Sequence, residues 1–131
     1  MMCCVRSQRG ATTSAFVAAL LPALVILTGL VVDGAQHVRF QRDLQTSAAA
    51  AARAGTDELA RTRVHGGRDV RAAVAAARER LRADGHEGTV AVHGGELQVQ
   101  LSGTTDTVFL SLIGVDQIDA EATARSRLVA G

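Results

Sequence analysis

The stretch GLVVDGAQHVRFQRDLQTSAAAAARAG, Gly29 to Gly55, decides the fold, because in it a hydrophobic run ends at an aspartate and a polar, alanine-rich helix follows. A buried core helix does not usually change character in this way, whereas a helix that leaves a lipid bilayer and enters water does. The 22 residues before the aspartate, Ala11 to Val32, carry no charge. As a helix they span roughly 33 Å, close to the ~30 Å hydrocarbon core of a bilayer. We therefore predict a transmembrane helix over 11–32.

A cleaved secretory signal is the alternative interpretation of this segment, since it is N-terminal and follows Arg6 and Arg9. The apolar region of such a signal is usually about 7–15 residues, which is shorter than this one. A cut after Ala35 would also place Asp33 where signal peptidases require a small neutral side chain. Both points favour an uncleaved, membrane-anchored chain.

The orientation of the predicted span rests on the charges beside it. Arg6 and Arg9 precede the span and Arg39 and Arg42 follow it closely, so a count of basic residues gives a tie. The short basic tail 1–10 contains no acid. We therefore expect a single pass through the cell (plasma) membrane, with the N-terminus cytoplasmic and the C-terminal part extracytoplasmic.

Composition limits what the part outside the membrane can be. The chain has 131 residues and is 47% hydrophobic but only 2% aromatic, and much of the hydrophobic share is alanine, so we expect a thin core. The formal net charge of +1 predicts no nucleic-acid partner. Cys3 and Cys4 both precede the apolar run, so the main body has no disulfide framework. We expect two free thiols there, with lipid attachment as the alternative.

After residue 32 the pattern predicts that the helix continues. Apolar and small residues recur at helical spacing and form one stripe: Phe40, Leu44, Ala48, Ala51, Gly55 and Leu59. Because most of them are small, we expect this stripe to let another helix, from a second copy or a partner, approach closely.

A second, amphipathic helix is predicted over 68–83, after the break at His65–Gly67, and Gly85 is its expected stop. Its apolar face comprises Val70, Val74, Ala77 and Leu81. Its arginines fall off that face: Arg71, Arg78, Arg80 and Arg82. We interpret them as a solvated face, with contact to lipid phosphates as the alternative.

The last third predicts a small sheet. TVAVHGGELQVQL, residues 89–101, alternates around Gly94–Gly95, and a two-residue turn there pairs His93 with Glu96 and fixes the register. A short helix ending at Gly114 is expected to pack on the sheet through Val108, Phe109, Leu112 and Ile113. Residues 116–129 alternate again and predict a third strand. The fold class is therefore α+β.

No catalytic arrangement is visible. The histidines His37, His65, His86 and His93 are scattered, with no spacing that suits two metal ligands on one helix face. Phosphate-binding glycine loops and nucleophile motifs are missing as well. We expect no enzyme, no cofactor or metal and no small-molecule substrate, and we interpret Asp33 as an anchor where the helix leaves the membrane rather than as a proton carrier.

Several motifs together resemble the TadE/TadG proteins of the Flp (type IVb) pilus assembly system. They are "RG" at Arg9–Gly10, "LLP" inside the span, the exit "VVDGAQ…RFQRDLQTSAAAAARAG" and the ending "FLSLIGV…IDAEATA". The likeness covers roughly 9–55 well and 107–124 loosely. The family's exit motif falls on these residues: Asp33, Gly34, Arg42, Gln45, Ala48, Ala51, Ala52 and Gly55.

The resemblance implies a single-pass envelope protein of pilin-like architecture, an accessory or minor pilin-like component of pilus assembly or secretion. Its implied partners are the lipid bilayer, pilus-assembly or pilin-like membrane proteins, and further copies of itself. Processed family members usually carry a glutamate five residues after the glycine, followed by Phe. Here Ala15 precedes Phe16, so the resemblance favours a stably anchored TadG-like protein over one cleaved after Gly10.

Four regions follow from these predictions: a cytoplasmic tail (1–10), a transmembrane helix (11–32), an extracytoplasmic helical segment (33–84) and a small α+β module (85–131). A membrane-tethered or secreted envelope domain that binds or senses a ligand unrelated to pili is the alternative function.

Overall fold

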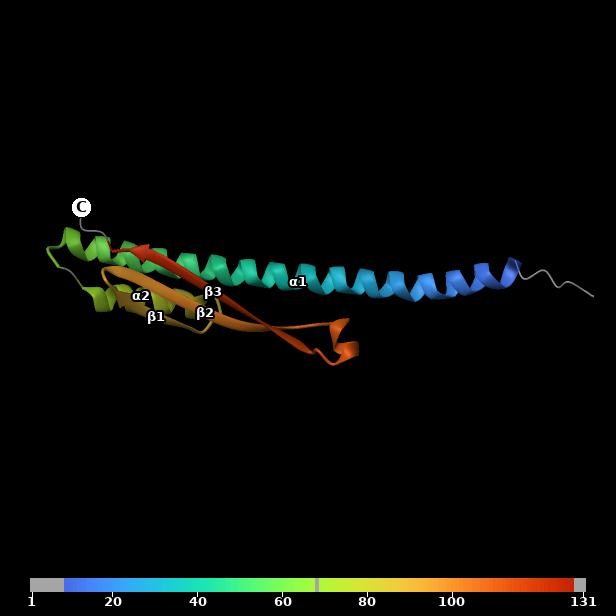
Figure 1. Ribbon diagram of the computed structural model, residues 1–131. Coiled ribbons are helices and arrows are strands. Elements are labelled where there is room, and N and C mark those ends of the chain that lie inside the picture. Colours follow the sequence, from blue (N-terminus) through green and yellow to red (C-terminus); the bar gives the residue numbers. More distant parts are fainter. Residues whose placement is uncertain (1–8, 68, 129–131) are drawn as a thin grey trace, which may run out of the picture.

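The computed structural model describes residues 9–67 and 69–128, with side chains from Thr13 onward, and has the predicted α+β architecture (Figure 1). Two helices, α1 (Arg9–Val64) and α2 (Val70–Ala83), precede strands β1 (Gly88–His93) and β2 (Glu96–Asp106). A short 3₁₀ helix, η1 (Leu110–Ile113), and strand β3 (Gln117–Arg127) follow.

The long helix α1 joins the apolar segment and the polar segment without a break, as predicted. It has 56 residues, about 84 Å at 1.5 Å per residue, and continues through Pro22. Its N-terminal half projects away from the rest of the chain (Figure 1). Large apolar side chains are exposed all along this half, for example Leu21 at 59%, Ile26 at 70% and Val31 at 70%. By length and composition, α1 is able to span a membrane near the N-terminus.

Helix α2 has clear start and stop signals. The Asp69 side chain caps it by accepting hydrogen bonds from the backbone N–H groups of Arg71 (2.9 Å) and Ala72 (3.1 Å). At its end Gly85 adopts the left-handed conformation (φ 76°), and the His86 N–H bonds to the Leu81 carbonyl at 2.9 Å. The predicted stop at Gly85 is therefore confirmed.

The sheet is antiparallel, with β2 between β1 and β3. The predicted hairpin register is confirmed, since His93 pairs with Glu96, and Gly94 and Gly95 both have positive φ. Strand β2 continues to Asp106, beyond the end of the predicted hairpin. It does so because β3 pairs along its whole length, out to Asp106 with Gln117.

Helices α1 and α2 pack on one face of this sheet and form one core with it, the head of the molecule (Figure 1). Small residues dominate the helix side of the core, which allows close contact. Gly55 lets α1 approach α2 closely, because a Cβ there would lie 2.9 Å from the Ala73 carbonyl oxygen. The core residues are Leu44, Ala48, Ala51, Ala52, Leu59, Ala73, Ala77, Leu81, Val90, Leu97, Val99, Leu101, Ala120, Ala122 and Leu128.

Two expectations are corrected by this packing. The stripe around Ala48 and Ala51 is not open to another molecule, because both residues have 0% exposure against the chain's own sheet and α2. The short helix does not pack on the sheet: η1 lies at the far end of the β2–β3 ribbon, beside the middle of α1 (Figure 1). The sheet needs no cover from η1 because the two long helices already provide it.

Candidate functional site

The candidate site is the contact between Asp33 and the loop that joins β2 to β3. Asp33 is the first residue after the apolar run, and its side chain is buried, with 3% exposure. Its carboxylate accepts three backbone hydrogen bonds: from Val108 at 3.1 Å, from Phe109 at 2.9 Å and from Leu110 at 2.8 Å. The carboxylate thus caps η1 and ties it to α1.

The charge state of Asp33 follows from the same contacts. Burial raises the pKa of its carboxyl, but the hydrogen bonds from Leu110, Val108 and Phe109 together lower it more, so the pKa lies below the ordinary 3.8. Asp33 is therefore ionised at neutral pH, which suits its role as acceptor of three N–H groups.

We call residues 107–116 the tip loop. Its backbone is largely hydrogen-bonded within itself: the Thr107 N–H bonds to the Asp116 carbonyl at 2.9 Å, and the Val115 N–H to the Leu110 carbonyl at 3.1 Å. Gly114 closes η1 in the left-handed conformation, at φ 91°. The loop is therefore a folded unit rather than a loose connection.

The tip loop also touches α1 one turn nearer the N-terminus than Asp33. A Cβ built on Gly29 would lie 2.5 Å from the ring of Phe109, so only glycine leaves room for this ring. Since Gly29 belongs to the apolar segment, the loop reaches down to the level of that segment's last turn.

Apolar side chains cover the outer surface of the tip loop. Leu112 is 82% exposed, Ile113 75% and Val108 56%. No charged residue occurs from Thr107 to Val115. The loop thus adds an uncharged, apolar surface next to the exposed apolar half of α1.

The other residues of the exit motif lie on two different sides of α1. Ala48, Ala51, Ala52 and Gly55 point into the core, as described above. A Cβ added at Gly34 would meet nothing within 4 Å. Arg42 and Gln45 line, with Thr46, Ala49, Ala50 and Arg53, a shallow hollow on the side of α1 that faces away from the sheet. The structure therefore brings only Asp33 together with the tip loop.

The arginines of α2 are all exposed, and the end of this helix lies far from Asp33. The His86 ring, just after α2, lies 3.5 Å from the Asp43 carboxylate, and Asp43 is ten residues beyond Asp33. That separation is about 15 Å along α1. The contact between the end of α2 and α1 therefore lies well away from the end of the apolar segment.

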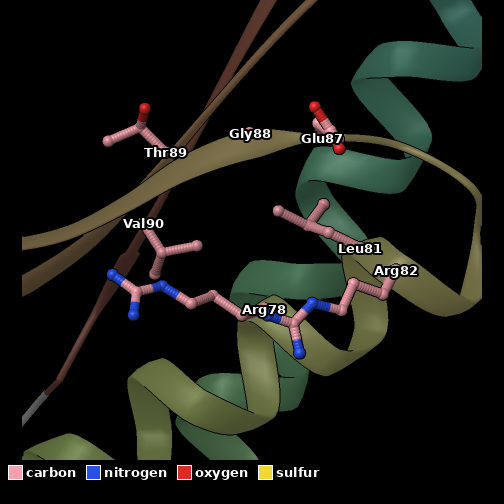
Figure 2. Close-up of a pocket in the computed structure, with 7 residues that line it drawn as sticks. All are labelled: Arg78, Leu81, Arg82, Glu87, Gly88, Thr89 and Val90. Atoms are coloured by element: carbon pink, nitrogen blue, oxygen red, sulfur yellow. The ribbon is translucent and has the colours of Figure 1, made fainter.

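A second hollow, of about 480 Å³, lies between α2 and the start of β1 (Figure 2). Arg78 and Arg82 come from the helix and Glu87 and Thr89 from the strand side, with Leu81 and Val90 between them. It is an open surface with no paired carboxylates and no nucleophile beside a base, so it does not resemble a catalytic centre.

Histidines and other metal-binding residues do not gather in the part of the chain that the structure describes, where no group of three His, Cys, Asp or Glu side chains could hold a metal ion. His65 contacts the Arg61 carbonyl at 3.0 Å through Nδ1. His37 lies one helical turn after Asp33, and its buried Nδ1 has no hydrogen-bond partner among the described residues. Gly10 lies in α1, while Cys3 and Cys4 are outside the described residues.

The sequence singled out Asp33 but not its partners. Val108, Phe109 and Leu110 are remote from it in the chain, and the apolar face of η1 suggested a contact with the sheet instead. The uncharged run from Thr107 to Val115, at the tip of a strand pair, was the one available signal.

Comparison with known proteins adds no relative: no protein-family model matches the chain, and no curated protein and no solved structure is similar to it.

Proposed function

We propose that the chain is a single-pass membrane protein of the TadE/TadG type that serves pilus assembly or secretion as an anchored accessory or minor pilin-like component. The observation that carries the proposal is the continuity of α1. One helix contains both the exposed apolar segment and the residues that pack against the sheet in the head's core. A head joined in this way to its anchor is suited to assembly beside other anchored helices.

Retention of the N-terminal segment is supported by Asp33. Cleavage after Ala35 would remove the carboxylate that holds three N–H groups of the tip loop. It would also remove Gly29 and so the contact with Phe109. The fold uses the end of the apolar segment as a structural part, which is unusual for a segment meant to be discarded. In the proposed topology the N-terminus is cytoplasmic and the head is extracytoplasmic.

The partner surface of α1 is the side that faces away from the sheet, since the small-residue stripe is already buried. Ala49 and Ala50 lie there between Arg42 and Arg53, at the shallow hollow. Small residues between arginines allow close approach of a helix that carries acidic or polar groups.

The first test is the intact mass of the chain, measured separately in membranes and in sheared extracellular material. A full-length chain found only in membranes supports an anchored assembly protein. A chain shortened by ten residues in sheared fibres would instead show a minor pilin processed after Gly10 despite Ala15.

The second test is purification of the crosslinked full-length chain from its own membranes. Pilins or components of a secretion ATPase platform are the expected partners, and Ala49→Leu should reduce their recovery. Ala75→Leu, at an exposed position of α2, is the matched control. An anchored chain that recovers only unrelated envelope components would contradict the pilus role and favour an envelope binding domain.

A further inference from the structure

We infer that the tip loop is a second membrane contact: the exposed side chains of Val108, Leu112 and Ile113 insert into the extracytoplasmic leaflet beside the span, at the boundary between acyl chains and headgroups. This inference rests on the proposed membrane anchoring of α1. It assigns a lipid-binding role to a part of the chain outside the predicted span.

The position of the loop along α1 is the first argument. Asp33 bonds to the loop's backbone, and Gly29, four residues deeper in the apolar segment, contacts Phe109. Four residues correspond to about 6 Å along a helix. With residues 11–32 in the hydrocarbon, the Phe109 ring lies about 6 Å below the level of Asp33. The loop around this ring therefore lies at the lipid interface.

The surface of the loop is the second argument. Leu112 and Ile113 are among the most exposed large apolar residues described, at 82% and 75%, while the polar Thr107 and Ser111 hydroxyls bond to carbonyls of the loop itself. This apolar surface continues that of the neighbouring α1 half, which the bilayer would cover. Lipid is therefore the occupant that fits both surfaces at once.

The backbone is the third argument, because irregular backbone enters a membrane interface only if its polar groups are satisfied. Asp33 accepts from the N–H groups of Val108, Phe109 and Leu110. The N–H groups of Leu112 and Gly114 bond to loop carbonyls at 3.2 Å and 3.1 Å. The Asp33 carboxylate thus accepts the hydrogen bonds that these three N–H groups would otherwise have to donate to water.

The test uses the full-length chain with Cys3→Ser and Cys4→Ser, reconstituted in vesicles of phosphatidylethanolamine and phosphatidylglycerol. A single cysteine is introduced by Leu112→Cys, by Gln100→Cys on the exposed face of the sheet, or by Leu21→Cys in the span. Each carries an environment-sensitive fluorophore, and quenching by nitroxide-labelled lipids is compared with quenching by iodide in the water. All three positions are exposed, so the head should fold in each variant.

The expected result is that lipid nitroxides quench the label at residue 112 several-fold more than the label at residue 100, with iodide in the reverse order. If the label at 21 is quenched by lipid but the label at 112 is quenched only by iodide, the inference is overturned while the anchor stands. Protection at 112 from both quenchers would overturn it in favour of a protein contact. If the label at 21 also escapes lipid quenching, the membrane anchoring itself fails, and the inference with it.

Discussion

The Asp33 carboxylate accepts a hydrogen bond of 2.8 Å from the backbone N–H of Leu110, 77 positions further along the chain. This contact closes the head onto the end of the apolar segment, since Val108 and Phe109 bond to the same carboxylate. Asp33 therefore does more than end the apolar run, because its carboxylate is the hydrogen-bond acceptor for the backbone of the tip loop.

Replacement of this acceptor should loosen the tip loop. In Asp33→Asn the side chain keeps its shape but loses its charge, and one of its two oxygens becomes an NH₂ group that faces backbone donors. We expect the amides of Val108, Phe109 and Leu110 to exchange with deuterium roughly tenfold faster or more, with little change in the head. Asp57→Asn, at an exposed position of α1, is the control. Unchanged exchange at all three amides would show that the carboxylate does not hold the loop.

The same contact should depend on pH in one direction. Because the folded-state pKa of Asp33 lies below 3.8, its contribution is fully present above that value and disappears as the pH falls through the folded pKa. The NMR shift of the Leu110 amide should therefore be constant at neutral pH and titrate only in the acid range. Asp33→Asn should abolish this titration. A midpoint near neutrality would contradict the assignment.

A larger side chain in the small-residue stripe of α1 should destabilise the head. Ala51 has 0% exposure, so the larger side chain of Ala51→Leu has no space, and we expect a loss of about 1–3 kcal/mol of unfolding free energy. Denaturant unfolding in detergent measures this loss. Ala60→Leu adds the same side chain on the exposed face of α1 and should change little. Equal stability of the two variants would mean that Ala51 is not in the core.

Two glycines of α1 should respond in opposite ways to alanine. In Gly55→Ala the new Cβ meets the Ala73 carbonyl oxygen at 2.9 Å and also the Leu97 side chain, so we expect a loss of about 1–3 kcal/mol. Gly34→Ala meets nothing within 4 Å and should gain up to about 1 kcal/mol from helix propensity. Thermal unfolding of both variants compares them, and a neutral Gly55→Ala would show that the contact relaxes without cost.

Local patterns allowed much of the fold to be predicted. The β1–β2 register follows from Gly94 and Gly95 because a two-residue turn leaves only one pairing for strands of period two. The end of α2 follows from Gly85, since glycine readily adopts the left-handed conformation there. The turn and the helix stop each depend on only a few neighbouring residues, so both can be predicted from the local sequence.

The candidate site could not be predicted because it depends on contacts between distant parts of the chain. The apolar spacing of Val108, Leu112 and Ile113 is the same whether these side chains pack on a sheet or stay exposed. What decides between them is the length of the β2–β3 ribbon, which extends to Asp106 and carries η1 past the end of the sheet's core. Likewise, the small-residue stripe has the same pattern for a partner helix and for the chain's own sheet.

Helix α1 runs without a break from Asp33, which holds the tip loop, to Phe40, which packs against the core of the head. This continuity has a geometric consequence. A helix turns about 100° per residue, so one residue inserted between them would swing the head around the anchor by about that angle and raise it by about 1.5 Å. Phe40 would then no longer lie on the same side of α1 as Asp33, and the head would carry the tip loop away from its acceptor. The contact therefore fixes the number of residues between Asp33 and Phe40, because even a whole added turn, which restores the rotation, moves the head by about 5.4 Å along α1 and breaks the hydrogen bonds to Asp33.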